Sequence, residues 1–349
     1  MMKYQPDFEQ TRIALYCGQP SRVPLFELKV DLHVMQAFMG KTFTSMRDHV
    51  DFWAAAGYDY IRVRAVYDFF KKTAKPHEGA YSAYGNHTMN ISWADTGQGM
   101  IRSEEDFDQF PWPTPQDIDY SPVEEAGKYL HDGMKIVSST TGIFESVWMM
   151  MGYEGFALAT IEQPDLIAQM FQKVGEIHYN IFNNTIELDH VGAMWMTDDI
   201  AYAGGLMVNP AIYRQYLFPW YKKMGALCQA HDIPYLYHSD GTLWNVLDDL
   251  IDCGFHALQP IEPKAMNIRE VKRKVQGKLC LIGNVDVDLL ARGTPEDVRR
   301  ITKQLLRDVA PGGGYCLGSG NSVPNYVPVE NYRAMVETVH EYGAYPIAL

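Results

Sequence analysis

This sequence lacks paired cysteines, long apolar runs and an excess of basic residues, and each absence excludes a class of protein. The five cysteines are scattered without a CxxC pair, which argues against a disulfide framework and against a four-thiolate zinc site. No stretch approaches the roughly 18 apolar residues that a membrane span needs, and the first residues form no secretory signal. We therefore expect a cytoplasmic protein with reduced thiols and without a membrane partner.

Acidic residues outnumber basic ones by 43 to 30, which gives the chain a formal net charge of −13. Nucleic-acid binding depends on clustered Lys and Arg that release counterions, so we expect no nucleic-acid partner. A neutral, cationic or protein-carried substrate is easier to accommodate. The chain has 349 residues, of which 47% are hydrophobic, and we expect one domain over residues 1–349.

Eight short apolar runs end in polar residues and predict eight strands with helical patterns between them. Alternation of strands and helices implies parallel pairing through crossovers. Eight such units predict an α/β fold, a closed (β/α)8 TIM barrel, whose functional groups gather at the carboxyl ends of the strands. The predicted strands are 26–31, 61–65, 136–140, 194–199, 235–241, 258–262, 281–286 and 315–321.

Four helices are predicted from their caps and apolar spacing. Thr294 is an expected N-cap, followed by Pro295 in the first turn and by acidic residues near the positive end of the helix dipole. The predicted helices are 294–309, 164–181, 329–342 and 209–230, the last with a bend at Pro219.

Residues 66–121 interrupt the alternation with a stretch rich in aromatic residues, Gly and Pro. Only residues 103–110 predict a short capped helix within it. Long insertions at the carboxyl ends of barrel strands commonly form binding loops, so we predict a lid or pocket wall between the second and third strands.

His238 and Asp240 lie two residues apart at the end of the fifth predicted strand, so their side chains point to the same face. In a barrel this face is the interior at its mouth, which suits metal ligation or proton transfer. A helix cap and a turn are the alternative roles. Glu262, at the end of the next strand, would supply a third metal ligand, or else a salt bridge to Lys264.

Further polar residues at strand ends are candidates for substrate contact. Asp198 and Asp199 are adjacent and must face opposite ways, and we favour Asp199 as the one that lines the site. Packing in the core is the alternative for the apolar stripe around Trp148. The predicted substrate-binding residues are Glu145, Trp148, Asp198, Asn284 and Asn321.

Several motifs resemble the uroporphyrinogen decarboxylase superfamily, which also includes corrinoid-dependent methyltransferases. They are His-Ser-Asp-Gly at 238–241, Gly-Asn-Val-Asp at 283–286, Gly-Thr-Pro-Glu-Asp at 293–297 and Val-Pro-Val-Glu-Asn at 327–331. The resemblance covers about residues 135–345 and implies the (β/α)8 barrel that the strand count also predicts.

Departures from the decarboxylases bear on function. The N-terminal stretch 11–22 lacks the paired-arginine motif that holds substrate carboxylates in that branch. The stretch 318–321 has no histidine, and Asp68 matches the decarboxylase aspartate only in a shifted alignment. A chain of charge −13 would also disfavour a porphyrinogen with eight carboxylates.

Coenzyme M methyltransferases of the superfamily bind zinc through His-x-Cys and a distant Cys. Here Asp240 and Asn321 stand at the positions of those two cysteines. Exchange of soft thiolates for oxygen donors changes the charge and softness of the metal site, which disfavours coenzyme M as the acceptor.

The resemblance thus implies a methyltransferase that demethylates a small O-methyl or N-methyl compound and passes the methyl group to a corrinoid protein. Cobalamin, free or carried by that partner, would be the acceptor cofactor. The predicted catalytic residues are His238, Asp199 and Glu262, and the predicted zinc ligands are His238, Asp240 and Glu262.

Two other functions stay open. One is a decarboxylase of a small acid held by Arg62 and Arg64, which share one strand face, although a buried ion-pair layer would also explain these residues. The other is a non-catalytic paralogue that binds a tetrapyrrole or corrinoid. A homodimer is also left open.

Overall fold

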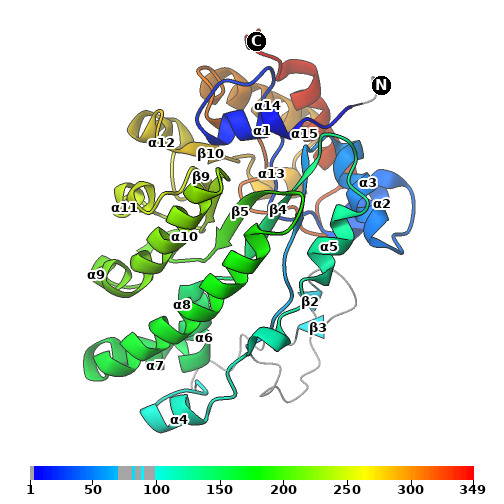
Figure 1. Ribbon diagram of the computed structural model, residues 1–349. Coiled ribbons are helices and arrows are strands. Elements are labelled where there is room, and N and C mark those ends of the chain that lie inside the picture. Colours follow the sequence, from blue (N-terminus) through cyan, green and yellow to red (C-terminus); the bar gives the residue numbers. More distant parts are fainter. Residues whose placement is uncertain (1–3, 70–80, 83–87, 90–98) are drawn as a thin grey trace.

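The computed structural model describes residues 4–69, 81–82, 88–89 and 99–349, and a curled parallel sheet lies at its centre (Figure 1). Seven described strands form this sheet, and every pair of neighbours is parallel, as in a TIM barrel. Their order is β1 (Tyr60–Val63), β4 (Lys135–Thr140), β5 (Val191–Thr197), β8 (Tyr235–His238), β9 (Ala257–Gln259), β10 (Cys280–Ile282) and β11 (Tyr315–Cys316).

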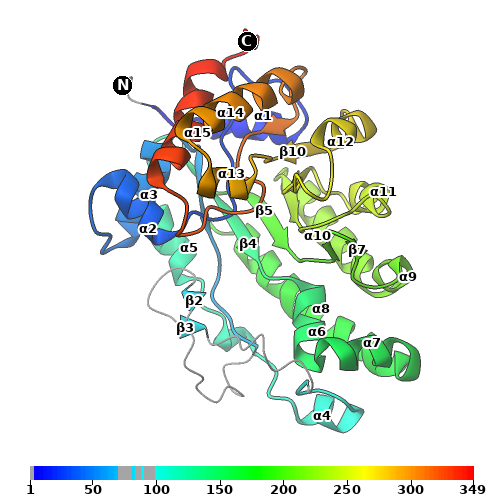
Figure 2. The same ribbon diagram turned by 180° about the vertical axis from the view of Figure 1, so that it is seen from behind.

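Helices surround the sheet, and the first and last helices of the chain, α1 and α15, lie on the same side of the molecule (Figures 1 and 2). Two short hairpins, β2–β3 (Tyr81–Ser82 with Thr88–Met89) and β6–β7 (Ala201–Tyr202 with Gly205–Leu206), lie outside the central sheet. The first helices are α1 (Phe8–Leu15), α2 (Leu32–Met39), α3 (Met46–Ala56), α4 (Glu104–Gln109), the 3₁₀ helix η1 (Pro115–Asp117), α5 (Ser121–Gly127), α6 (Ile143–Met151), α7 (Tyr153–Glu162) and α8 (Pro164–Ile186). The later ones are α9 (Pro210–Ile212), the π-helix η2 (Tyr213–Leu217), α10 (Phe218–Ala230), α11 (Leu247–Asp252), α12 (Ile268–Val275), α13 (Val287–Arg292), α14 (Pro295–Val309) and α15 (Val329–Tyr342).

The helix predictions from caps are confirmed. The Thr294 hydroxyl accepts a hydrogen bond from the Asp297 amide at 3.2 Å, and the Thr294 amide donates to the Asp297 carboxylate at 3.3 Å, as expected of a capping box. The predicted helix 209–230 is continuous but irregular, because its π-turn η2 directly precedes α10. Pro219 has no amide hydrogen and its ring crowds the carbonyl four residues earlier, so the turn before it widens.

The predicted strand 26–31 does not form a ladder in the described structure, and this corrects the count of eight regular strands. Two isolated parallel bridges, from Leu25 to Leu317 and from Val30 to Val323, place this segment beside the end of β11. The segment takes the remaining place in the barrel with only fragments of strand pairing.

Side chains close the barrel between this segment and β1. The Tyr60 hydroxyl accepts a hydrogen bond from the Glu27 amide at 2.7 Å and donates to the Glu27 carbonyl at 2.8 Å. Arg62 donates to the Leu28 carbonyl at 2.9 Å. These bonds satisfy backbone groups that a neighbouring strand would otherwise pair.

Aromatic side chains fill the barrel interior next to this closure. Phe26 stacks on Tyr60 with ring centroids 4.4 Å apart and meets Trp195 edge-on at 5.2 Å. All three are fully buried. Burial of each such ring stabilises the fold by about 1.5–3 kcal/mol, so the closing segment is held by packing as well as by hydrogen bonds.

The described parts of the insertion 66–121 agree with the short helix predicted there, since α4 begins after Ser103, whose hydroxyl accepts from the Asp106 amide at 3.1 Å. The two ends of the insertion pair through Val66 and Asp119. Residues 70–80, 83–87 and 90–98 lie outside the described residues, so the lid role stays a prediction, as does the single domain. Among the described helices, none is long and apolar enough to cross a membrane.

Glu27 should make the stability of the fold depend on pH. It is fully buried, and burial raises its pKa from 4.5 to about 8, against the opposing hydrogen bonds from Ser319. Its titratable neighbours Tyr58 and Tyr332 have pKa values raised further above 10 and do not ionise in this range.

Between pH 4.5 and 8 the folded protein therefore holds a proton on Glu27 that the unfolded chain releases. The free energy of unfolding should fall as the pH rises through this window, by at most about 1.4 kcal/mol per pH unit from this group. Glu27→Gln should remove that contribution. Urea unfolding at several pH values between 4.5 and 8 measures the free energy of unfolding of both proteins. The same dependence on pH in wild type and Glu27→Gln would contradict the prediction.

Candidate functional site

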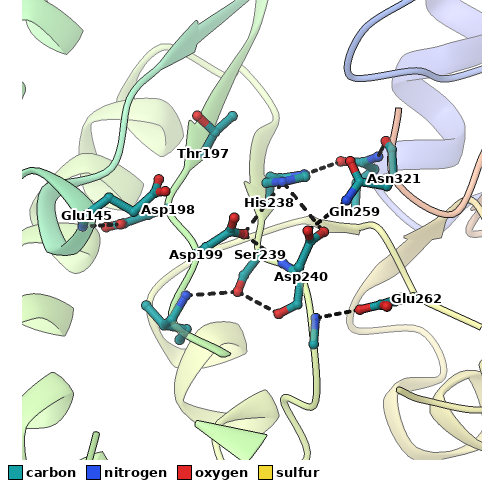
Figure 3. A network of polar contacts seen from close by, with 12 residues as sticks. Glu145, Thr197, Asp198, Asp199, His238, Ser239, Asp240, Gln259, Glu262 and Asn321 are labelled. Carbon is teal, nitrogen blue, oxygen red and sulfur yellow. Dashed lines mark hydrogen bonds and ion pairs between the residues drawn. The ribbon is translucent and has the colours of Figure 1, made fainter. Parts of the chain in front are cut away.

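The candidate site lies at the carboxyl ends of β5, β8 and β9, where three polar side chains converge (Figure 3). His238 is the last residue of β8 and is only 6% exposed. Its Nε2 lies 3.6 Å from Asp199 Oδ1 and 3.9 Å from Asp240 Oδ1. Strand alternation explains this convergence, because His238 and Asp240 project to the same face at the barrel mouth.

These three residues form the one group of potential metal ligands found among the described residues. One ligand atom from each of Asp199, His238 and Asp240 lies within 4.8 Å of the others. Asp240 Oδ1 is buried and accepts no hydrogen bond from the described residues, which is costly for a carboxylate oxygen without a ligand. A nitrogen and two oxygen donors around an unsatisfied buried atom fit a divalent cation such as zinc.

Gln259 sets the protonation pattern of the histidine. Its amide nitrogen donates to the Asn321 carbonyl at 2.7 Å, which leaves its amide oxygen to face His238 Nδ1. The oxygen can only accept, so Nδ1 carries a hydrogen and Nε2 is the nitrogen that faces the two aspartates. Such a second hydrogen bond is the usual device that orients a metal-binding or proton-transferring histidine.

Asn321 and Asp199 hold Asp240 in place. The Asn321 amide donates to Asp240 Oδ2 at 2.7 Å, and Asp199 Oδ1 accepts from the Asp240 backbone amide at 2.8 Å. Burial raises the pKa of Asp240, His238 opposes this shift, and the charge of Asp199 adds to it. The cluster therefore favours a cation that would stabilise the ionised form of Asp240.

Glu262 lies apart from this group. Its Oε2 accepts from the Gly241 amide at 3.1 Å, and it holds the turn after Asp240. The alternative salt bridge to Lys264 is not formed, since Lys264 pairs with Asp288. Asn284 donates to the Ile261 carbonyl and thereby fixes the chain just before Glu262.

Asp198 points away from the barrel interior, opposite to Asp199. Its carboxylate accepts from the Tyr221 hydroxyl at 2.6 Å and from the backbone amides of Phe144 and Glu145, both at 2.9 Å. It thus binds the first turn of α6 and ties it to α10. Burial raises the pKa of Asp198, although these three donors oppose the shift.

Glu145 lies in the first turn of α6 beside the site, and Trp148 follows three residues later on the same helix. Burial raises the pKa of Glu145 well above its usual range, and the negative charges of Asp199 and Asp198 add to this effect. Trp148 is half-buried and meets the Tyr153 ring edge-on at 5.9 Å. Among the described residues, His238 is the only basic side chain within ion-pair distance of Asp199 or Asp240, so the site is strongly acidic.

Sequence reasoning missed Gln259 and Glu27. A polar residue inside an apolar strand was the available signal at both positions. Which side chain each one would meet depends on the register between strands, and the His238–Gln259 pairing appears only in the assembled sheet.

A parallel barrel with acidic and histidine side chains gathered at its carboxyl strand ends has the architecture of a TIM-barrel enzyme. The family model described as uroporphyrinogen decarboxylase (URO-D) matches residues 97–342, and the chain belongs to this family, as its motifs predict.

Known relatives and a solved structure agree with this family. A uroporphyrinogen decarboxylase from Coxiella burnetii is 24% identical over 265 residues, which cover 70% of this chain and 68% of the relative. One from Actinobacillus succinogenes is 32% identical over 108 residues, which cover 31% of this chain and 29% of the relative. A methyltransferase from Methanosarcina mazei shares the fold with a TM-score of 0.72, covering 97% of this chain and 99% of that chain at 19% identity.

If this cluster binds zinc, removal of the Gln259 amide should weaken that binding. Gln259→Leu leaves His238 Nδ1 without an acceptor and frees the ring, and we expect zinc affinity to fall about 10- to 100-fold. Competition with a chromogenic chelator measures the affinity. Gln172→Leu, on the exposed face of α8, is the control, and equal zinc affinity of the Gln259 variant and the wild type would contradict the prediction.

Proposed function

We propose that this protein is a methyltransferase of a corrinoid-dependent system, which takes a methyl group from a small O-methyl or N-methyl compound. The acceptor would be cobalamin carried by a corrinoid protein or free. The observation that carries the proposal is the cluster of His238, Asp199 and Asp240 at the barrel mouth of a URO-D family member that lacks the decarboxylase arginine pair.

The donor atoms support zinc at this cluster. His238 Nε2 and the carboxylates of Asp240 and Asp199 would hold it, since Glu262 is occupied with the Gly241 amide. Zinc would supply Lewis-acid polarisation of the heteroatom that carries the methyl group. An oxygen-rich set holds zinc less exclusively than thiolates do, so we expect sub-stoichiometric metal after purification.

The chain's own residues would then orient the donor. Transfer would break the bond between the methyl carbon and oxygen or nitrogen, and the electron pair of that bond would stay on the heteroatom, which takes up a proton. The Co(I) form of the cobalamin acceptor would supply the electron pair for the new bond to the methyl carbon. Without a metal, His238 Nε2 is placed to hold that proton between the two aspartates. Asn284 and Glu262 would shape the wall beside them.

The decisive experiment is single-turnover methylation of Co(I) cobalamin with methoxylated aromatics and methylamines as donors. We expect methylcobalamin from at least one donor. His238→Ala should lower its rate by at least about 100-fold and lose the metal, because general acid–base or metal assistance is removed. His131→Ala, an exposed histidine paired with Asp51, should do neither.

Absence of methylcobalamin with every donor would overturn the proposal. Full activity after exhaustive chelation would instead refute the metal and leave His238 as a general acid. Tight binding of an unreacted corrinoid or tetrapyrrole would point to a non-catalytic paralogue.

A decarboxylase of a small acid is the second candidate, because the curated relatives are named decarboxylases. Arg62 donates to Ser139 Oγ and to the Leu28 carbonyl, both at 2.9 Å, and so contributes to barrel closure. Arg64 directly follows the end of β1 at Val63 and would hold the carboxylate.

Release of carbon dioxide from a panel of small acids tests this second function. We expect Arg64→Ala to abolish release with the fold intact, and Arg292→Ala, which alters a highly exposed side chain, to leave it unchanged. Release that survives in Arg64→Ala would argue against the carboxylate role of this arginine.

A further inference from the structure

The last barrel strand departs from its partner close to the site. Leu317 pairs with Leu25, and Val323 pairs with Val30. Val323 lies six residues after Leu317, whereas Val30 lies only five residues after Leu25. The segment between Leu317 and Val323 therefore carries one extra residue. We call residues 318–322 the bulge, because an additional residue in one strand bends it and re-aims its side chains.

The Glu27 carboxyl group replaces a backbone hydrogen bond that a regular ladder would form here. The Leu317 amide donates to the Pro24 carbonyl at 2.9 Å, and the Phe26 amide donates to the Leu317 carbonyl at 2.8 Å. A regular parallel ladder would next join the Ser319 amide to the Phe26 carbonyl. The Ser319 amide donates instead to Glu27 Oε1 at 2.6 Å.

The carboxyl group is rigidly held. Ser319 Oγ donates to Glu27 Oε2 at 2.7 Å, so one serine engages both oxygens. The backbone of Glu27 is fixed at the same time by the Tyr60 hydroxyl. Gly318 passes so close that a Cβ there would lie 1.9 Å from the Phe26 carbonyl oxygen, and only glycine fits.

The bulge ends at the site. Asn321, two residues after Ser319, presents its carbonyl to Gln259 and its side-chain amide to Asp240. Gln259 in turn receives His238 Nδ1. The buried carboxyl group of Glu27 is therefore connected with His238 Nδ1. The path runs through the hydrogen bond to Ser319, the backbone from Ser319 to Asn321, and the hydrogen bonds of Gln259.

We propose that Glu27 is a positioning residue, which replaces a backbone rung with its carboxyl group, opens the bulge and thereby aims Asn321 at Gln259 and Asp240. His238 keeps its Nδ1–H tautomer only while Gln259 is held by Asn321. The catalytic consequence rests on the proposed function, whereas the effect on the histidine does not.

The test compares Glu27→Leu with Glu27→Gln. Leucine keeps the volume but accepts no hydrogen bond, so the Ser319 amide loses its partner and the bulge should relax. Glutamine keeps an acceptor and resembles the protonated acid. The first readout is the ¹⁵N spectrum of the imidazole nitrogens, with His238 assigned from His238→Ala, and the second is the single-turnover methylation rate.

We expect Glu27→Leu to shift the His238 signals away from the Nδ1–H pattern and to lower the methylation rate about 10- to 100-fold, as loss of an orienting hydrogen bond does. Glu27→Gln should keep the signals and most of the rate. Thr185→Val removes a buried hydroxyl on α8 that donates to Ile181, and it should destabilise without moving the His238 signals.

Unchanged His238 signals in folded Glu27→Leu would overturn the proposal, as would equal losses in Glu27→Gln and Glu27→Leu. If Glu27→Leu does not fold, Ser319→Ala decides, since it removes one of the two bonds to the carboxyl group. Its His238 signals should shift in the same direction, and no shift would refute the role. If the wild type transfers no methyl group, the proposed function fails and the ¹⁵N comparison still decides this inference.

Discussion

The closure of the barrel depends on polar side chains rather than on a complete ladder. Tyr60 satisfies both backbone groups of Glu27, and the Glu27 carboxyl group satisfies the Ser319 amide on the other side. Buried backbone groups without partners would cost free energy, so these bonds are what allow residues 24–31 to fill the last place. Phe26 and Trp195 add the apolar packing that makes this arrangement stable.

The closure also gives the site its form. A regular eighth strand would continue its rungs past Ser319 and carry Asn321 along the barrel wall. The extra residue in the bulge turns Asn321 toward Gln259 and Asp240. Bulges often occur beside functional sites for this reason. Stability of the fold and orientation of His238 are therefore linked through the same buried carboxyl group.

The acidity of the site has a similar origin. Parallel strands end together, so the carboxylates that follow β5 and β8 gather at one mouth with a single histidine. Burial then raises the pKa of Asp240 and of Glu145 and makes a cationic partner favourable. Family membership alone would not predict a cationic partner, because proteins of one fold carry out different chemistry.

Local sequence determined seven of the eight predicted strands, the helices predicted from caps and apolar spacing, the caps that begin α4 and α14, and that His238 and Asp240 share a face. It also determined the family, whose motifs are contiguous. Only the tertiary structure decided that 26–31 pairs in fragments, that Asp199 and not Glu262 approaches His238, and that Gln259 orients the ring. The physical reason is that periodicity sets the direction of a side chain within its own strand. Which side chain it contacts depends on the register between strands. Here it also depends on a one-residue bulge that pairs with a segment almost 300 residues earlier in the sequence.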